Sequence, residues 1–292
     1  MEISSKFVGT QLKEYKKIVN WRETMNYAAA VNDTNPHYFD DERETGIIAP
    51  PMFATAATWP ILQNFHKYIK VSDFPFEVLN QQVHYREYLQ FHNPVKPGDE
   101  LRINGTIAAI LPRKAGTHII IKFEATNQTG RHLFTEYIGG MLRGVICADN
   151  GEGEDALPKI PSPPEELTNV WEQKIKIEPM LPFIYDACSN IVFPIHTSQK
   201  FAHAVGLPGI ILQGTATLAL AVREIVNRHA DGNPLKLQSL SCNFSGMVFP
   251  DSEIRVQLLS INKEANEQHL FFHVLDENGH IVIKNGYASI GQ

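Results

Sequence analysis

GIIAPPMFATAAT at residues 46–58 and GIILQGTATLALAV at residues 209–222 are the two stretches of sequence that decide the fold of this chain. Both begin with Gly-Ile-Ile, and both continue into small, mostly apolar residues. The second run would be apolar on every side of a helix, which indicates a helix that is buried all round. We therefore expect two buried central helices, near residues 52–68 and 215–227, each wrapped by a sheet.

A second repeated phrase lies upstream of each helix. The first copy ends with DTNPHY at residues 33–38, and Tyr27 stands eleven positions before its last residue. The second copy ends with IVFPIH at residues 191–196, and Tyr185 stands eleven positions before its last residue. The first copy has an acid but lacks a histidine at its end, whereas the second has the histidine but lacks the acid. The ordered repeat indicates an internal duplication.

Turns and strands recur in the same order after each helix. The Val and the second Pro of NPVKPGDEL at residues 93–101 are repeated 153 positions later, in GMVFPDSEI at residues 246–254. Alternating apolar and polar residues follow both turns, which is typical of antiparallel strands with one buried face. We expect about five antiparallel strands in each half.

The repeat is interrupted once, by ADNGEGED at residues 148–155 and a proline-rich run at 157–164. Glycine, proline and acidic residues do not build a core, so this segment is expected to be a flexible linker. The predicted organisation is an N-terminal unit at 1–147, a linker at 148–164 and a C-terminal unit at 165–292.

The overall composition narrows the classes of function. A formal net charge of −6 disfavours nucleic acid as a partner, because such a binder would carry a basic stripe. The three cysteines share no close spacing, so we expect a reduced intracellular compartment and neither a zinc cluster nor a disulfide framework. The N-terminal residues lack a signal-peptide core, and no run approaches the roughly 18 apolar residues of a membrane span. We expect a cytoplasmic protein without a membrane partner, a metal or another cofactor.

The repeated phrases resemble the MaoC-like dehydratases. DTNP at residues 33–36 and GIIAPP at 46–51 resemble the N-terminal half of that family, and FPIH at 193–196 and GIILQG at 209–214 resemble its C-terminal half. The resemblance covers nearly the whole chain in the right order. It implies an α+β double hot-dog fold, in which two long central helices are each wrapped by a curled antiparallel sheet. It also implies (R)-specific hydration of a trans-2-enoyl thioester, or the reverse dehydration, with acyl-CoA as the expected substrate.

In this family an Asp and a His, five positions apart, flank one water, because water must lose a proton as carbon gains one. In the present chain the acid position holds Asp33 in the first half but Ile191 in the second. The His position holds Tyr38 in the first half and His196 in the second. Neither half carries the complete pair.

The family also holds the developing enolate oxygen with a backbone N–H at the start of the central helix. Gly214 is followed by Thr215, so the second helix has free N–H groups at this point. Pro50 and Pro51 occupy the equivalent positions of the first helix, and proline has no N–H to donate. The thioester is therefore expected against the second helix, with the first half shaping the acyl pocket.

The expected site combines both halves. Its catalytic residues are His196 as the acid–base group, Gly214 as the oxyanion donor, and Asp33 as the partner acid if the two motifs meet across a pseudo-two-fold axis. Further residues expected to contact substrate are Asn35, Tyr38, Gln213 and Thr215. His84 and Arg86, which open a predicted strand, are expected to have a structural role or to lie at the rim.

Two other functions fit the same fold. The incomplete pair in both halves supports a non-catalytic protein that binds an acyl thioester. A hot-dog thioesterase would need a carboxylate near the helix start, and Gly214 has no acid within several residues on either side. The expected partners are an acyl-thioester substrate and, as a possible assembly, a second copy of the chain in a homodimer.

Overall fold

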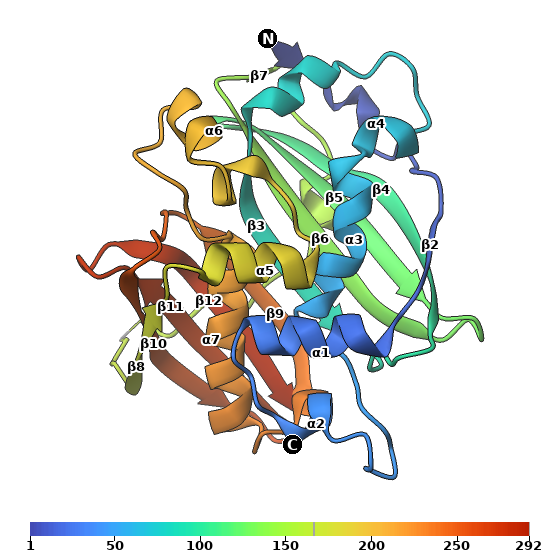
Figure 1. Cartoon of the computed structure of the whole chain (residues 1–292). Coiled ribbons are helices and arrows are strands. Elements are labelled where there is room, and N and C mark those ends of the chain that lie inside the picture. Colours follow the sequence, from blue (N-terminus) through green and yellow to red (C-terminus); the bar gives the residue numbers. More distant parts are fainter. Residues whose placement is uncertain (166, 292) are drawn as a thin grey trace.

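One antiparallel sheet runs through the computed structural model, which describes residues 1–165 and 167–291 (Figure 1). Residues 166 and 292, both within the predicted unit 165–292, lie outside the described residues. In the described part the sheet has ten strands, in the order β2-β4-β5-β6-β3-β9-β12-β11-β10-β8. The strands are β2 (Tyr15–Ile18), β3 (Gln82–Phe91), β4 (Glu100–Arg113), β5 (Gly116–Thr126), β6 (His132–Arg143), β8 (Trp171–Ile177), β9 (Leu237–Phe244), β10 (Ser252–Lys263), β11 (Glu267–Leu275) and β12 (Ile281–Gly291).

The two halves of the chain contribute five strands each and are joined by the equivalent strands β3 and β9. These two pair antiparallel, with Glu87 opposite Cys242 and Leu89 opposite Leu240. Each of them follows the central helix of its own half, so a pseudo-two-fold axis passes between them. The predicted α+β double hot-dog fold is confirmed. A separate pair of short parallel strands, β1 (Glu2–Ile3) and β7 (Ile146–Cys147), lies near the N-terminus.

The two central helices are α3 (Phe53–Gln63) and α7 (Gly214–His229). The prediction of 215–227 falls within α7, whose first turns are buried throughout. The single helix predicted at 52–68 is wrong, because α3 ends before Asn64 and α4 (Phe65–Tyr68) follows separately. Pro60 lies inside α3, and its missing N–H weakens the helix at that point. None of the described helices is long and apolar enough to span a membrane.

Shorter helices carry the repeated tyrosine phrases. They are α1 (Trp21–Ala30) and α2 (Pro36–Phe39) in the first half, and α5 (Leu181–Ser189), η4 (Pro194–His196) and α6 (Gln199–Ala204) in the second. α1 and α5 pack together in front of the central helices (Figure 1). The hydroxyls of Tyr27 and Tyr185, both fully buried, are 2.8 Å apart and share a hydrogen bond. The repeated tyrosines thus meet at the pseudo-two-fold axis.

The segment predicted as a linker lies alongside β4 and then crosses a face of the sheet. Glu152 forms a β-bridge with Ile110, and Leu157 packs against a small apolar cluster outside the main core. The backbone at Gly153 has φ of +92°, and a Cβ there would lie 2.1 Å from the carbonyl oxygen of Ala108. Only glycine can make so close an approach.

Candidate active site

His196, the last residue of η4, is oriented by one backbone carbonyl. Its Nδ1 lies 2.8 Å from the carbonyl oxygen of Ile211. A carbonyl can only accept, so Nδ1 carries the proton and Nε2 keeps a free lone pair. Burial lowers the pKa of His196 to about 4, and the hydrogen bond to Ile211 offsets this only in part. The ring is therefore neutral at pH 7 and suited to act as a general base through Nε2.

The start of α7 places free backbone donors close to this histidine. Ile211, which holds His196, stands three residues before Gly214, where α7 begins. The N–H groups of Gly214 and Thr215 make no hydrogen bond with any described residue, as is usual in a first helical turn. Together with the helix dipole, they favour a negatively charged oxygen at this point.

Further polar atoms surround the same helix start. Gln213 is buried, and its Nε2 donates to the carbonyl oxygen of Pro182 at 3.1 Å. Its Oε1 has no partner in the described chain, and the buried hydroxyl of Thr215 makes no well-aligned hydrogen bond there. Buried polar atoms are costly when unpaired, so such a group indicates a place where water or a ligand binds. The packing at Gly214 is tight, since a Cβ there would lie 3.0 Å from the ring of Phe244.

The first motif keeps its acid in a different setting. Asp33 is buried, and its Oδ1 accepts the N–H of Asn35 at 3.2 Å. Burial raises the pKa of Asp33, and Arg223 of α7 lowers it only in part. Asn35 caps α2 by accepting the N–H of His37 at 3.0 Å, and its Nδ2 donates to the carbonyl oxygen of Gly232 at 2.6 Å. Asn35 therefore ties the first motif to the far end of α7.

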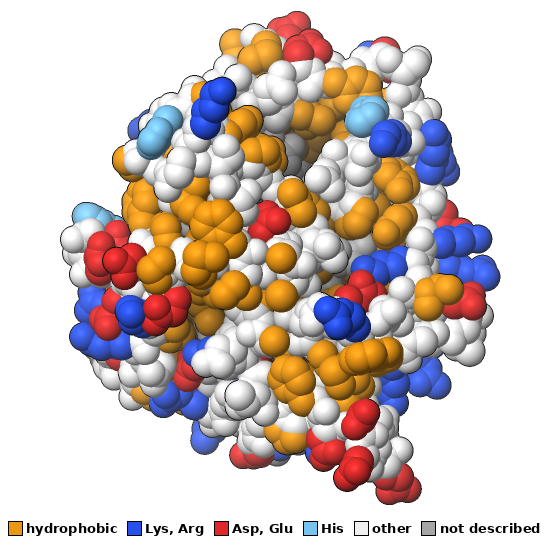
Figure 2. Space-filling model, in the orientation of Figure 1, with side chains coloured by type: hydrophobic (Ala, Val, Ile, Leu, Met, Phe, Trp, Pro, Cys, Tyr) orange, Lys and Arg blue, Asp and Glu red, His pale blue; other side chains and the backbone are white. Residues whose placement is uncertain are grey.

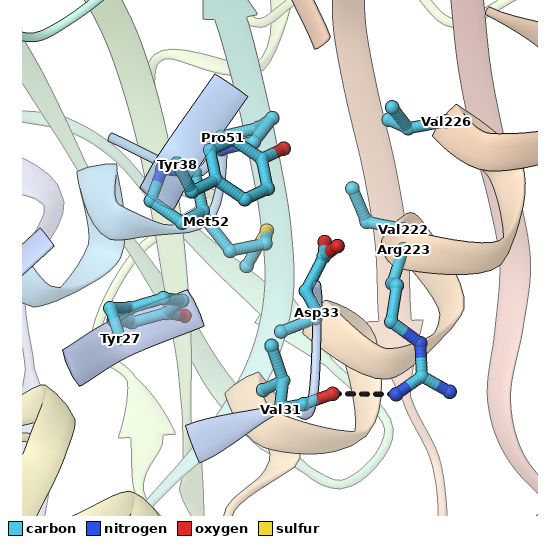
Figure 3. Close-up of a pocket in the computed structure, with 11 residues that line it drawn as sticks. Tyr27, Val31, Asp33, Tyr38, Pro51, Met52, Val222, Arg223 and Val226 are labelled. Carbon is cyan, nitrogen blue, oxygen red and sulfur yellow. Dashed lines mark hydrogen bonds between the residues drawn. The ribbon is translucent and has the colours of Figure 1, made fainter. Parts of the chain in front are cut away.

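Asp33 faces a small cavity between the first motif and α7 (Figure 3). The cavity has a volume of about 10 Å³, which is room for roughly one water molecule. Arg223 borders it and donates from Nη1 to the carbonyl oxygen of Val31 at 2.6 Å. The lining comes from Tyr27, Val31, Asp33, Tyr38, Pro50, Pro51 and Met52 of the first half and from Ala219, Val222, Arg223 and Val226 of α7.

Asp33 and His196 border different parts of α7. The cavity at Asp33 borders α7 between Ala219 and Val226, whereas His196 contacts Ile211, just before the start of α7 at Gly214. With a rise of 1.5 Å per residue, these backbone levels are about 8 to 18 Å apart along the helix axis. The role of Asp33 as partner acid of His196 stays a prediction. Each motif occupies its own end of α7.

The first central helix lacks one donor of the second, because Pro51 stands where α7 has Gly214. Pro50 and Pro51 precede α3, so Met52 offers the first free amide at this end. The asymmetry expected between the two helix starts is therefore present in the structure. Tyr38, predicted as a substrate contact, is buried beside Pro51 and Met52 and lines the Asp33 cavity (Figure 3).

Two fully buried carboxyls, Glu87 and Glu136, have no counterpart among the predicted site residues. Glu136 alternates with Phe134 and Ile138 on the buried face of β6. Glu87 similarly precedes Leu89 on the buried face of β3. The sequence does contain a signal for them, because each glutamate stands at a position of its strand where the alternation predicts an apolar residue. Glutamate is rarely buried without a partner, so such a position indicates a special role.

Two family descriptions match consecutive parts of the chain. Residues 6–136 match the FAS1-like dehydratase domain region, and residues 168–277 match the MaoC like domain. Together they cover most of both halves and leave out the whole linker.

Curated relatives are similar at low identity. The peroxisomal multifunctional enzyme type 2 of Drosophila melanogaster is 24% identical over 212 residues, which are 71% of this chain and 34% of that protein. The peroxisomal enoyl-CoA hydratase 2 of Arabidopsis thaliana is 25% identical over 187 residues, 60% of this chain and 59% of that protein. The chain spans about a third or less of the length of the multifunctional enzymes and fatty acid synthase subunits that it matches.

A solved structure has the same fold. The MaoC-like dehydratase from Phytophthora capsici superposes with a TM-score of 0.83, at 17% identity, and the match covers 98% of each chain. Since this identity is low, the likeness concerns the fold alone.

Proposed function

We propose that this chain, whose two halves match the FAS1-like dehydratase domain region and the MaoC like domain, interconverts a trans-2-enoyl thioester and the corresponding 3-hydroxyacyl thioester, with acyl-CoA as the thioester. The observation that carries the proposal is the neutral, buried His196 beside the free amides of Gly214 and Thr215. A base for water and donors for an enolate oxygen are two of the groups that this reaction requires.

In the hydration direction, Nε2 of His196 takes a proton from water as the water oxygen bonds to C3. The electron pair of the C2–C3 double bond moves to the thioester oxygen, which the amides of Gly214 and Thr215 stabilise. An acid group of the protein then delivers a proton to C2 as the electron pair returns from the thioester oxygen, and dehydration is the reverse sequence. Gln213, with its unpaired Oε1, is proposed to bind the thioester or the water.

The first half is proposed to shape the acyl pocket. Asp33 and Tyr38 border the small cavity beside α7, and Asn35 fixes the segment that carries them. The homodimer and the cytoplasmic location stay predictions, and two of the relatives carry the word peroxisomal in their names.

The direct test incubates the full chain with a panel of trans-2-enoyl-CoA and (R)- and (S)-3-hydroxyacyl-CoA compounds of increasing chain length. Product analysis by mass spectrometry should show gain or loss of one water from the (R) series. Release of free CoA without such products would instead identify a thioesterase.

A non-catalytic binding protein is the second candidate, because neither half carries the complete acid–histidine pair. It predicts saturable binding of acyl-CoA by calorimetry and no turnover of any member of the panel. Turnover of one compound that requires His196 would exclude this candidate.

A further inference from the structure

Two glutamates lie side by side in the middle of the sheet, on the face that carries the core. Glu87 of β3 pairs with Ile138 of β6, and Glu136 of β6 pairs with Leu89 of β3, so the two are diagonal neighbours on one face. Both side chains are fully buried. Neither carboxyl makes a well-aligned hydrogen bond with any described residue. Burial of this kind is expensive for an ionised group, so a functional reason is required.

A bulge in β3 adds a histidine to this pair. Three positions separate His84 from Glu87, and in a regular strand they would point to opposite faces. The register of β3 against β6 shifts between His84 and Arg86, which brings His84 to the face of Glu87. Nε2 of His84 lies 3.2 Å from Oε2 of Glu87, a close contact whose geometry is too poor for a hydrogen bond. Bulges often re-aim side chains in this way next to active sites.

Glu87, Glu136 and His84 form a cluster that is connected to the start of α7 by side-chain packing. The ring of His84 packs on Phe244 of β9, with 4.4 Å between ring centroids. Phe244 is the residue that a Cβ on Gly214 would meet at 3.0 Å. Glu87 lies opposite Cys242, two residues before Phe244 on the same strand face. Contacts through His84 and Phe244 therefore connect the carboxyl of Glu87 to the helix start at which the thioester is proposed to bind.

The cluster holds protons at neutral pH. Burial raises the pKa of Glu87 and of Glu136 well above the usual range, and the neighbouring Glu87 raises that of Glu136 further. Burial lowers the pKa of His84 to about 4. Two carboxyls in contact in a dry interior do not both ionise. The titratable groups that face Glu87 are Glu136 of β6, His84 of β3, Cys242 of β9, Tyr27 of α1 and Tyr185 of α5.

The second motif has Ile191 where the family has its acid, so one proton-transfer group is missing beside His196. We propose that Glu87, held by His84 and Glu136, is the acid that exchanges the C2 proton of the thioester at the start of α7, while His196 exchanges the proton of water. This inference rests on the proposed hydration.

The proposed step balances. In hydration, the C3–O bond forms and the C2–C3 double bond opens, and His196 gains a proton from the water. The electron pair returns from the thioester oxygen to form the C2–H bond, and the proton of that bond comes from Glu87. Return of the proton from His196 to Glu87 restores the starting state.

The test compares Glu87→Gln, Glu136→Gln and, as a surface control, Glu124→Gln, whose residue is exposed on β5. The probe is the enoyl-CoA of the panel that the wild type turns over best. Glu87→Gln keeps the shape of the protonated side chain, so we expect kcat to fall on the order of 10²–10⁴-fold with little change in KM. Glu124→Gln should match the wild type. An active wild type with Glu87→Gln within about twofold of it would overturn this inference but not the proposed function, whereas a wild type inactive on every thioester would overturn both.

A second measurement does not depend on turnover. Infrared difference spectra at pH 7 should contain the carbonyl stretch of a buried protonated carboxyl in the wild type and in Glu136→Gln. Because burial also raises the pKa of Glu136, Glu87→Gln should lower the intensity of the band rather than abolish it. If the wild type lacks the band, or if Glu87→Gln leaves its intensity unchanged, Glu87 is not the proton donor. If a variant fails to fold, the wild-type spectrum alone still shows whether the protein contains a buried protonated carboxyl.

Discussion

The two ends of α7 carry the two copies of one motif, and they have kept different parts of it. At the start of the helix, His196 stands beside the free amides of Gly214 and Thr215, but the acid position holds Ile191. Near the other end, Asp33 and Asn35 remain, but Asn35 serves as a tie to Gly232. After a duplication, one copy of a motif can lose its catalytic residues and keep a structural role, while the other copy keeps the anion site.

Figure 2 shows that apolar side chains also gather on the surface around α5, on the second-half side of the molecule.

The largest effect should come from His196→Ala. Removal of the only base at the helix start should lower kcat for hydration on the order of 10²–10⁴-fold, because proton transfer from water is lost. His37→Ala is the matched control, since this half-buried side chain lies in the first motif and its removal should leave turnover nearly unchanged. Steady-state kinetics measures kcat of both variants and of the wild type, and circular dichroism checks that each is folded. Equal turnover by the His196 variant would move the chemistry to another residue.

Gly214→Val should have the next largest effect. The new side chain would press on Phe244 and block the approach of the thioester to the amides of α7. Loss of an oxyanion donor costs about 10²–10³-fold in kcat in other enzymes. Gly209→Val offers a comparison, because a Cβ at Gly209 would meet only the tip of Gln199, at 3.4 Å. A normal rate for Gly214→Val would show that the thioester binds elsewhere.

Pro51→Gly tests the other helix start. It supplies an N–H that proline lacks and loosens the wall of the cavity at Asp33. We expect the preferred acyl chain length to change more than kcat does. Relative kcat/KM across the enoyl-CoA panel measures the effect. If a ligand-bound structure placed the thioester carbonyl at this start of α3, the assignment of the two ends would have to be exchanged.

The smallest effect on activity is expected from Asn35→Ala. The variant loses the cap of α2 and leaves the carbonyl of Gly232 without its partner, which should lower the free energy of unfolding by about 1–3 kcal/mol. Turnover at a temperature well below the melting transition should remain close to that of the wild type. Denaturant unfolding and kinetics on the same sample separate the two quantities. A large loss of kcat without a loss of stability would give Asn35 a direct role in the reaction.

Patterns local to the chain predicted the elements well. The strands expected after each turn, the five strands of each half and α7 follow from alternation and from small apolar residues. The single helix predicted at 52–68 was wrong because α3 ends before Asn64, a break that the small apolar residues of this stretch do not indicate. The contrast between Gly214 and Pro51 could also be predicted, because the presence of an N–H is a property of the residue itself.

Which side chains share a site was decided by the tertiary structure. The sequence left open whether Asp33 and His196 meet across the pseudo-two-fold axis, and in the structure they border different parts of α7. His84 joins Glu87 only because a bulge shifts the register of β3, and Glu136 joins them only because β6 pairs with β3. The sequence by itself determined the duplicated fold, its turns and the donors at each helix start, since these depend on neighbours along the chain. Strand register and helix length in space determined the composition of the candidate site, since proximity between distant residues is a property of the packed molecule.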